Sequence, residues 1–155
     1  MPFVIRYPRA IKPGSVTKDF ALNVDFPETF LDYAGIDIPD FMQGRSLRPV
    51  LEGNTPADWQ TSLYYRYWEH LSLEHRVGAH YGIRTHQYKL IYYYGEALGS
   101  SDASDEKREP EWELFDFEND PHEMKNVYHD PAYAETVKEL KDELYRLKDK
   151  VEDYE

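Results

Sequence analysis

The sequence has 155 residues, with 18 Lys and Arg, 30 Asp and Glu, and no Cys, which is enough for one ordinary domain or for one domain and part of another. The missing cysteines exclude a disulfide framework, a thiolate-bound metal and a thiol nucleophile. A net charge of −12 argues against a basic surface for nucleic acid or an anionic membrane, and no apolar run approaches the ~20 residues that span a bilayer.

The acidity is concentrated at one end of the chain. Residues 1–100 carry 11 acidic and 10 basic residues, whereas residues 101–155 carry 19 and 8. We interpret the last third as a strongly solvated surface. Pairs of carboxylates in this part say little about a site, because so many acids produce pairs by chance.

The first 58 residues contain two predicted elements and a long connection. Residues 3–7 are rich in β-forming side chains and end at a proline, which predicts a short strand. Apolar side chains recur at helical spacing between Asp25, a candidate N-cap, and Gly35, which predicts a helix. Residues 36–57 are rich in proline and glycine, so we expect a connection without regular structure.

The middle of the chain is aromatic and β-branched. Four such segments predict strands, at residues 63–68, 79–85, 88–94 and 112–117. The last of them alternates apolar with acidic residues, which is the period of a half-buried strand. Residues 95–111 are rich in Ser, Asp, Glu and Gly and indicate an exposed, mobile loop. Strands joined in this way favour an antiparallel sheet.

The C-terminal segment carries the strongest helical pattern. Asp130 can cap it and Pro131 suits its first position. Apolar residues then recur at intervals of three and four, at Val137, Leu140, Leu144, Leu147 and Val151. We expect this helix to cover the sheet, with a coiled-coil dimer as the alternative. The predicted class is α+β: a four-stranded antiparallel sheet packed by a long C-terminal helix and preceded by a strand, a helix and a long loop.

Histidines are the first candidates for chemistry. His70, His75 and His80 recur every five residues, with Glu69 and Glu74 beside two of them. Five-residue spacing fits neither one face of a helix nor one face of a strand, and zinc requires three or four convergent ligands. A metal site, ordinary polar loop residues and a polar binding rim all remain open.

Other constellations are incomplete. The sequence has no Gly-x-Ser-x-Gly and no phosphate-cradling glycine motif. The aromatic residues 64–68 suit either a sugar-stacking platform or a strand in a sheet core. Composition and spacing alone therefore give no complete catalytic site.

Several segments together resemble sulfatases of the alkaline-phosphatase superfamily. The pattern comprises PFVIRYP at 2–8, DFPETFLDYAGI at 25–36 and GRSLRPVL at 44–51. Further along, two segments resemble the C-terminal subdomain of the N-sulphoglucosamine sulphohydrolase type: YGIRTHQYKLI at 81–91 and WELFDFENDPHEMKN at 112–126. The resemblance implies that residues 1–58 are the end of an incomplete α/β sulfatase catalytic domain and that residues 59–155 are the C-terminal subdomain.

The same resemblance draws attention to what the chain does not contain. Related sulfatases use a formylglycine made from Cys or Ser in a Cys/Ser-x-Pro-x-Arg motif, yet none of the ten prolines here is followed two positions later by Arg. Their calcium ligands and catalytic Lys and His lie upstream of the segment that matches residues 2–8. The resemblance therefore implies a sulfatase fragment that is inactive alone, has no cofactor or metal residues of its own, and belongs to a calcium-dependent protein acting on sulfated carbohydrate.

In such sulfatases the C-terminal subdomain can contribute to the substrate rim. The candidates here are His80, His75, His70, Glu69 and Arg76, because imidazole and guanidinium groups hydrogen-bond sugar hydroxyls and sulfate. Expected partners are the missing catalytic domain or a second copy of the chain, and a sulfated glycan. A stand-alone glycan-binding module and a non-catalytic partner subunit are the alternatives. Relatives are commonly periplasmic, lysosomal or secreted, but any leader would lie upstream.

Overall fold

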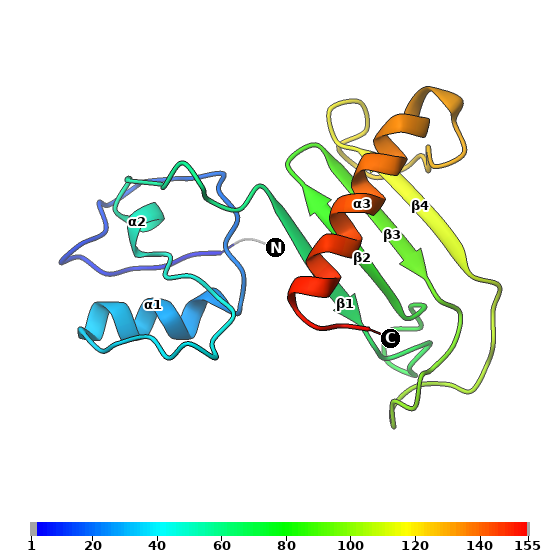
Figure 1. Cartoon of the computed structure of the whole chain (residues 1–155), viewed down its shortest axis with the longest axis horizontal. Coiled ribbons are helices and arrows are strands. Elements are labelled where there is room, and N and C mark those ends of the chain that lie inside the picture. The colour runs from blue at the N-terminus through cyan, green and yellow to red at the C-terminus, as the bar shows by residue number, and fades with distance from the viewer. Residues whose placement is uncertain (1–2, 155) are drawn as a thin grey trace. The chain divides into compact units, whose positions relative to one another are not determined.

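The computed structural model describes residues 3–154, which form two compact units that divide between Thr61 and Ser62 (Figure 1). We call them the N-terminal unit and the C-terminal unit. The division lies near residue 58, where the sequence places its boundary. The assignment of the two units to particular domains of a sulfatase stays a prediction.

The N-terminal unit contains two helices, α1 (Asp25–Ala34) and α2 (Arg48–Leu51). The prediction of α1 is confirmed, and Gly35 ends it in the left-handed region at φ 70°, where a residue without Cβ is unstrained. The N-cap is Val24 and not Asp25, because the Asp25 carboxylate is directed to other backbone groups. The short helix α2 lies in the connection that was expected to have no regular structure.

The strand predicted at residues 3–7 is not formed. A strand needs a neighbour for its backbone N–H and C=O groups, and the described residues of this unit include no other strand. Two aromatic side chains of the segment instead pack on α1: Phe3 stacks on Phe26 with ring centroids 4.9 Å apart, and Tyr7 lies 4.8 Å from Tyr33. These residues have a high β-propensity, but the described part of the N-terminal unit contains no second strand with which they could pair.

The C-terminal unit is built on the predicted four-stranded antiparallel sheet. Its strands are β1 (Ser62–Tyr67), β2 (His80–Thr85), β3 (Tyr88–Tyr93) and β4 (Glu111–Asp116), and they pair in the order of the chain. Neighbouring strands are joined by consecutive turns and loops, so the sheet is a simple meander. The fold class predicted from the sequence is confirmed.

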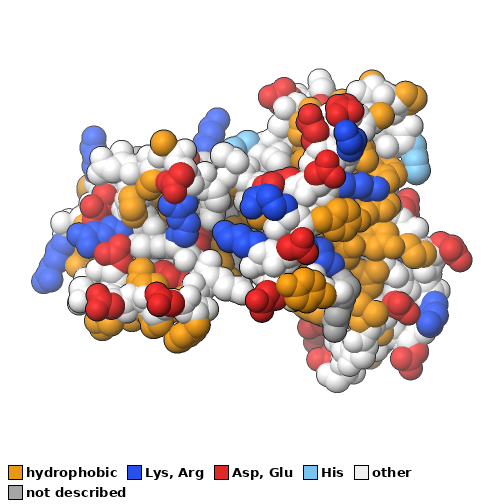
Figure 2. Space-filling model, in the orientation of Figure 1, with side chains coloured by type: hydrophobic (Ala, Val, Ile, Leu, Met, Phe, Trp, Pro, Cys, Tyr) orange, Lys and Arg blue, Asp and Glu red, His pale blue; other side chains and the backbone are white. Residues whose placement is uncertain are grey.

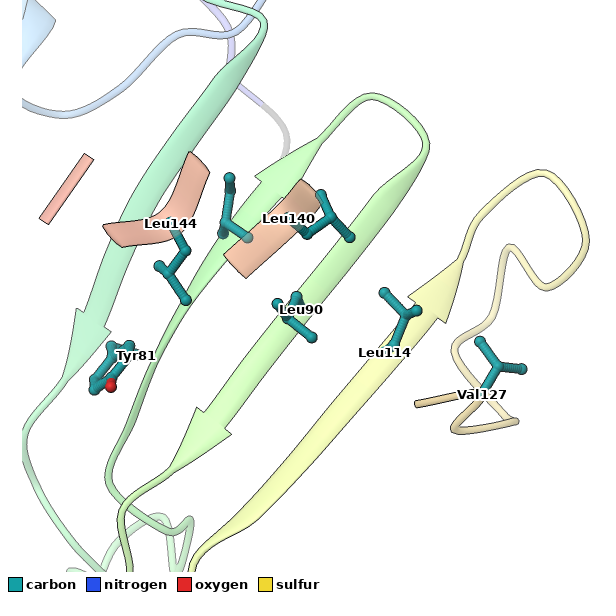
Figure 3. Close-up of a cluster of buried hydrophobic side chains, with 7 residues drawn as sticks. Tyr81, Leu90, Leu114, Val127, Leu140 and Leu144 are labelled. Atoms are coloured by element: carbon teal, nitrogen blue, oxygen red, sulfur yellow. The ribbon is translucent and has the colours of Figure 1, made fainter. Parts of the chain in front are cut away.

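The C-terminal helix α3 (Ala134–Lys150) packs on one face of this sheet. A 3₁₀ turn (Pro131–Tyr133) leads into it, and the Asp130 carboxylate accepts a hydrogen bond from the Ala132 N–H at 3.0 Å. Leu140 and Leu144 enter the core against the strands (Figure 3). The buried core consists of Tyr81, Ile83, Leu90, Leu114, Val127, Leu140 and Leu144. The apolar stripe of α3 therefore covers its own sheet and is not left for a coiled coil.

The segment after α3 is fastened to the first strand. The Asp153 carboxylate accepts hydrogen bonds from the Tyr64 hydroxyl and from the Arg66 guanidinium. That guanidinium also lies over the Trp68 ring, 3.6 Å from its centroid. The side chain of Arg66 is almost fully buried, and the Asp153 carboxylate compensates its charge. Within the described part of the chain, no helix is long and apolar enough to cross a membrane.

Candidate functional site

The motif GRSLRPVL at 44–51 has a structural explanation in the N-terminal unit. Three buried polar side chains of α1 bind the backbone of this segment. Glu28 accepts from the Gly44 N–H at 2.8 Å, Asp25 from the Arg45 N–H at 2.9 Å, and Thr29 from the Leu47 N–H at 2.8 Å. A Cβ on Gly44 would lie 2.0 Å from the Val24 carbonyl oxygen, so only glycine fits. These residues shape the scaffold and carry no chemistry.

The second motif region, at 112–126, is structural as well. Asn126 protects the outer edge of β4, because its side chain accepts from the Leu114 N–H at 3.0 Å and donates to the Trp112 carbonyl at 3.2 Å. Asp120 holds the turn before it by accepting from the Met124 and Lys125 N–H groups. An edge strand occupied in this way cannot pair with another chain.

The candidate site lies between two loops of the C-terminal unit. The loop after β1 (residues 68–79) and the loop between β3 and β4 (residues 94–110) form the walls of an open cavity of about 780 Å³, a size typical of small-molecule sites. Its lining is mainly polar and consists of Glu69, Leu71, Ser72, Leu73, Glu74, Arg76, Ser101, Asp102, Ala103, Ser104, Glu106 and Arg108.

His70 holds the two loops together from behind the cavity. Its Nδ1 accepts from the Ala79 N–H at 3.1 Å, which leaves the proton on Nε2 to donate to the Glu106 carbonyl oxygen at 2.9 Å. The His70 carbonyl oxygen also accepts from the Ser104 N–H at 2.7 Å. Because the residue is only 1% exposed and both ring nitrogens are engaged, His70 positions the loops and cannot reach a ligand.

The five predicted rim residues therefore do not lie together. Glu69 and Arg76 line the cavity, and His75 is exposed on the same loop without being part of the lining. Leu71 and Arg76 adopt left-handed backbone conformations at φ 50°, which is uncommon for residues with a Cβ and concentrates at functional loops. His70 lies behind the cavity, and His80 lies elsewhere.

His80 projects from β2 on the face of the sheet opposite α3. Its ring is surrounded by Tyr65, Tyr67 and Tyr93, whose centroids lie 5.8, 5.5 and 5.0 Å away. The Nδ1 atom is 2.8 Å from the Gly78 carbonyl oxygen, so Nδ1 carries the proton of the neutral ring. Burial lowers the pKa of His80 below its ordinary value, which favours this neutral form at pH 7.

Sequence reasoning missed the second wall of the cavity. Residues 101–108 were interpreted as part of an exposed loop, and they supply Ser101, Asp102, Ser104, Glu106 and Arg108 to the lining. No periodicity marks such a segment, and its contacts with the first loop join residues more than 30 positions apart, such as His70 and Glu106.

The lining of the cavity is rich in groups that donate or accept hydrogen bonds. It has four carboxylates, two guanidinium groups and three serine hydroxyls, which suits a polyhydroxylated ligand. One guanidinium, that of Arg108, pairs with Glu106 at 2.9 Å. Among residues 3–154, no three His, Asp or Glu side chains are gathered as a metal would require. The donor set here does not fit the calcium of a sulfatase.

A four-stranded antiparallel sheet covered by one helix, with a polar cavity between its loops, defines the C-terminal unit as an α+β domain. The chain belongs to the N-sulphoglucosamine sulphohydrolase C-terminal family, whose model matches residues 1–150. This establishes the family suggested by the sequence motifs, and the chain is homologous to the C-terminal part of sulfatases.

One named relative and one solved structure illustrate the relationship. The N-acetylglucosamine-6-O-sulfatase of Bacteroides thetaiotaomicron is 47% identical over 142 residues, which are 90% of this chain and 23% of that protein. The second is a protein whose structure was solved in complex with its substrate, D-glucosamine-2-N,6-O-disulfate. Its sequence is 44% identical to this chain, and the two structures superpose with a TM-score of 0.83 over 98% of this chain and 28% of that protein's chain.

A related hydrolase shares the fold more distantly. The phosphonate monoester hydrolase of Silicibacter pomeroyi is 26% identical, with a TM-score of 0.68 over 89% of this chain and 27% of its own. The chain thus spans about a quarter of the length of each of these three relatives.

Proposed function

We propose that the chain is the C-terminal part of a sulfatase that hydrolyses sulfate esters of carbohydrates. In this proposal it supports the catalytic part and contributes side chains to the rim of the substrate site. The observation that carries the proposal is the 47% identity with an N-acetylglucosamine-6-O-sulfatase over 90% of the chain. The relative's activity suggests a 6-O-sulfated amino sugar as the substrate class.

Glu69 and Arg76 are the strongest candidates for the rim. Both line the cavity, where a guanidinium can hold a sulfate group through two parallel hydrogen bonds and a carboxylate can accept from sugar hydroxyls. His75 extends this polar surface on the same loop. His70 serves as a positioning residue, and His80 would contribute only to a ligand that reaches the other face of the sheet.

We place the chemical step outside this chain. Cleavage in related sulfatases uses a formylglycine nucleophile and calcium, which stabilises charge on the sulfuryl oxygens. The sequence has no Cys and no Cys/Ser-x-Pro-x-Arg motif, and its carboxylates are not grouped as a calcium site would require in the described residues. We therefore expect the longer protein, and not this chain, to hold both.

The partner that we propose is the catalytic part of the same kind of sulfatase. The N-terminal unit exposes large apolar side chains, among them Phe30 at 65% and Phe41 at 85% exposure, and Figure 2 shows apolar side chains along the edge of the unit that carries α1. Such a surface usually marks an interface. Without its partner, the chain should self-associate, which sedimentation velocity tests; a clean monomer with one cooperative melting transition for both units would contradict this.

A chimera tests the proposed function. In the Bacteroides thetaiotaomicron relative, the C-terminal quarter is replaced by this chain, and turnover of glucosamine 6-sulfate is compared with that of the unmodified relative. We expect a metal-dependent active chimera, and no turnover of a chromogenic aryl sulfate by the chain alone above a heat-killed control. A folded chimera with an intact formylglycine and no turnover, or turnover by the chain alone, would overturn the proposal.

One observation favours a second function, a glycan-binding module. Tyr65, Tyr67 and Tyr93 gather around His80 on the face opposite α3, and aromatic faces with polar tips stack on sugars. The net charge of −12 opposes binding of polyanionic glycans. Sulfate-dependent binding of the chain alone on a glycan array would favour this alternative over the first.

A further inference from the structure

The strand register arranges the side chains of the face opposite α3, which we call the open face, in three rows. The row nearest the turn between β2 and β3 consists of Leu63, Arg84, Lys89 and Phe115. The second consists of Tyr65, Gly82, Ile91 and Glu113, and the third of Tyr67, His80, Tyr93 and Glu111. The first row therefore places two cations directly opposite each other on neighbouring strands.

Arg84 is a half-buried cation without a carboxylate. Its guanidinium lies over the Phe117 ring, 3.4 Å from the centroid, and its one hydrogen bond is a 3.5 Å contact from Nη1 to the Tyr88 carbonyl oxygen. Within the part of the chain that the structure describes, no Asp or Glu pairs with Arg84. Because a guanidinium has five N–H donors, most of its hydrogen-bonding capacity is directed to no group of the protein.

The neighbouring Lys89 makes this arrangement less favourable still. Like charges directly opposite on adjacent strands destabilise a sheet. The carboxylates near the pair act on Lys89 and not on Arg84: Glu123 contacts Lys89, and Glu113 raises its pKa. Burial lowers the pKa of Arg84, and burial followed by the charge of Arg84 lowers the pKa of Lys89. The chain has 30 acidic residues, so a shortage of carboxylates does not explain why Arg84 has none.

We propose that Arg84, with Lys89 beside it, is a binding site for an oxyanion on the open face of the sheet. The stack on Phe117 covers one surface of the guanidinium plane and fixes its orientation. The edge of the plane then presents parallel N–H groups, which is the geometry that binds carboxylate or sulfate bidentately. The chemistry that the occupant must offer is an oxyanion with two acceptor oxygens, a sulfate group or a carboxylate, and the experiment below distinguishes the two.

The site is distinct from the cavity between the loops, because none of its residues lines that cavity. It also does not rest on the proposed sulfatase function, which depends on the chimera experiment. An inactive chimera would leave the oxyanion site standing, and loss of the oxyanion site would leave the chimera result unaffected.

NMR of the arginine side chains tests the site on the natural chain. In 15N-labelled protein at pH 6, sodium chloride is replaced stepwise by sodium sulfate or by sodium acetate at constant ionic strength, and each Nε–Hε resonance is followed. The Arg84 resonance is identified by its loss in Arg84→Lys. Arg9, an exposed arginine of the N-terminal unit, is the matched internal control.

We expect a saturable shift of the Arg84 resonance in the millimolar range, while the Arg9 resonance changes only slightly and linearly. Saturation by sulfate but not acetate would identify a sulfate group as the occupant, and saturation by acetate would identify a carboxylate. Linear changes of Arg84 that parallel those of Arg9 in both salts would overturn the proposal. The titration is made on the unmodified protein, and only the assignment of the Arg84 resonance depends on Arg84→Lys.

Discussion

The two units differ in how much of their interior is apolar. The C-terminal unit has seven buried apolar residues in one core between sheet and helix, whereas the N-terminal unit has three, Leu47, Val50 and Trp59. In the N-terminal unit the fully buried side chains of α1 are Asp25, Glu28 and Thr29, while Phe30 is exposed. The comparison teaches that the C-terminal unit is held by an apolar core between sheet and helix, whereas the N-terminal unit is organised mainly by hydrogen bonds from buried polar side chains of α1.

The largest effect should come from the core of the C-terminal unit. Leu144→Ala removes a fully buried side chain between α3 and the sheet and should lower the free energy of unfolding of this unit by about 2–5 kcal/mol. Urea denaturation followed by tyrosine and tryptophan fluorescence measures the loss. Tyr145→Ala, on the exposed side of the same helix, is the control and should cost far less. A loss below about 1 kcal/mol for Leu144→Ala would mean that α3 does not hold this core.

In the N-terminal unit the largest effect should come from a polar residue. Asp25→Ala leaves the N–H groups of Leu22 and Arg45 without their acceptor. Each of these groups that stays buried should lower the free energy of unfolding by about 1–3 kcal/mol. Hydrogen exchange should show loss of protection at the Arg45 amide, with the C-terminal unit unchanged. The control is Asp37→Ala at an exposed position of the same unit, which should leave the hydrogen exchange of the Arg45 amide unchanged. Unchanged protection of Arg45 in Asp25→Ala would refute the polar organisation of this unit.

The hydrogen bonds of Asp153 with Tyr64 and Arg66 should contribute a smaller amount to stability, and this contribution should depend on pH. Burial alone raises the pKa of Asp153, but hydrogen bonds from Tyr64 and Arg66 outweigh it, so the pKa lies below the ordinary value of 3.8. A carboxylate with a depressed pKa contributes stability that is complete above its unfolded pKa and is lost as pH falls through its folded pKa. Asp153→Asn should therefore cost about 1–3 kcal/mol at pH 7.

Urea denaturation at several pH values measures this difference. The gap between Asp153→Asn and the natural chain should narrow below pH 3.8 and nearly close once Asp153 is protonated in the folded state. Asp142→Asn on the same C-terminal segment is the charge-matched control, because the described residues give Asp142 no hydrogen-bond or ion-pair partner. A gap that is the same at pH 7 and pH 2.5 would show that the ion pair does not stabilise the fold.

The smallest effect on stability should come from the cavity. Arg76→Gln changes an exposed loop residue and should alter the free energy of unfolding by less than about 0.5 kcal/mol. In the active chimera the same change should raise KM by about tenfold, which corresponds to one lost interaction of about 1.4 kcal/mol, and should leave kcat nearly unchanged. Arg146→Gln on α3, outside the cavity lining, is the control. An unaltered KM would remove Arg76 from the proposed rim.

Sequence reasoning was most successful where structure is local. Alternation predicted β4, and the spacing of Leu140, Leu144 and Leu147 predicted α3, because each pattern reflects the period of one element facing one core. It was wrong about the strand at residues 3–7, whose β-propensity is fulfilled only if another strand pairs with it. The β-propensity of one segment produces a strand only where a second strand lies beside it to pair with its backbone. The described residues of the N-terminal unit provide no such strand.

The candidate site shows the same limit. His70, His75 and His80 were all named as candidates for one substrate rim, but the first is buried behind the cavity, the second is exposed on a loop and the third lies on the open face. A loop has no period, so spacing along it does not determine where its side chains point. The cavity wall at 101–108 was missed for the same reason.

The sequence by itself determined the antiparallel sheet, the covering helix, the family and the absence of a formylglycine motif, since all of these are written in periodicity or in contiguous motifs. Only the tertiary structure decided which loops enclose a cavity, which polar residues are buried in α1, and that Arg84 lies opposite Lys89 without a carboxylate. These features depend on contacts between residues far apart in the chain, and such contacts exist only after the chain has folded.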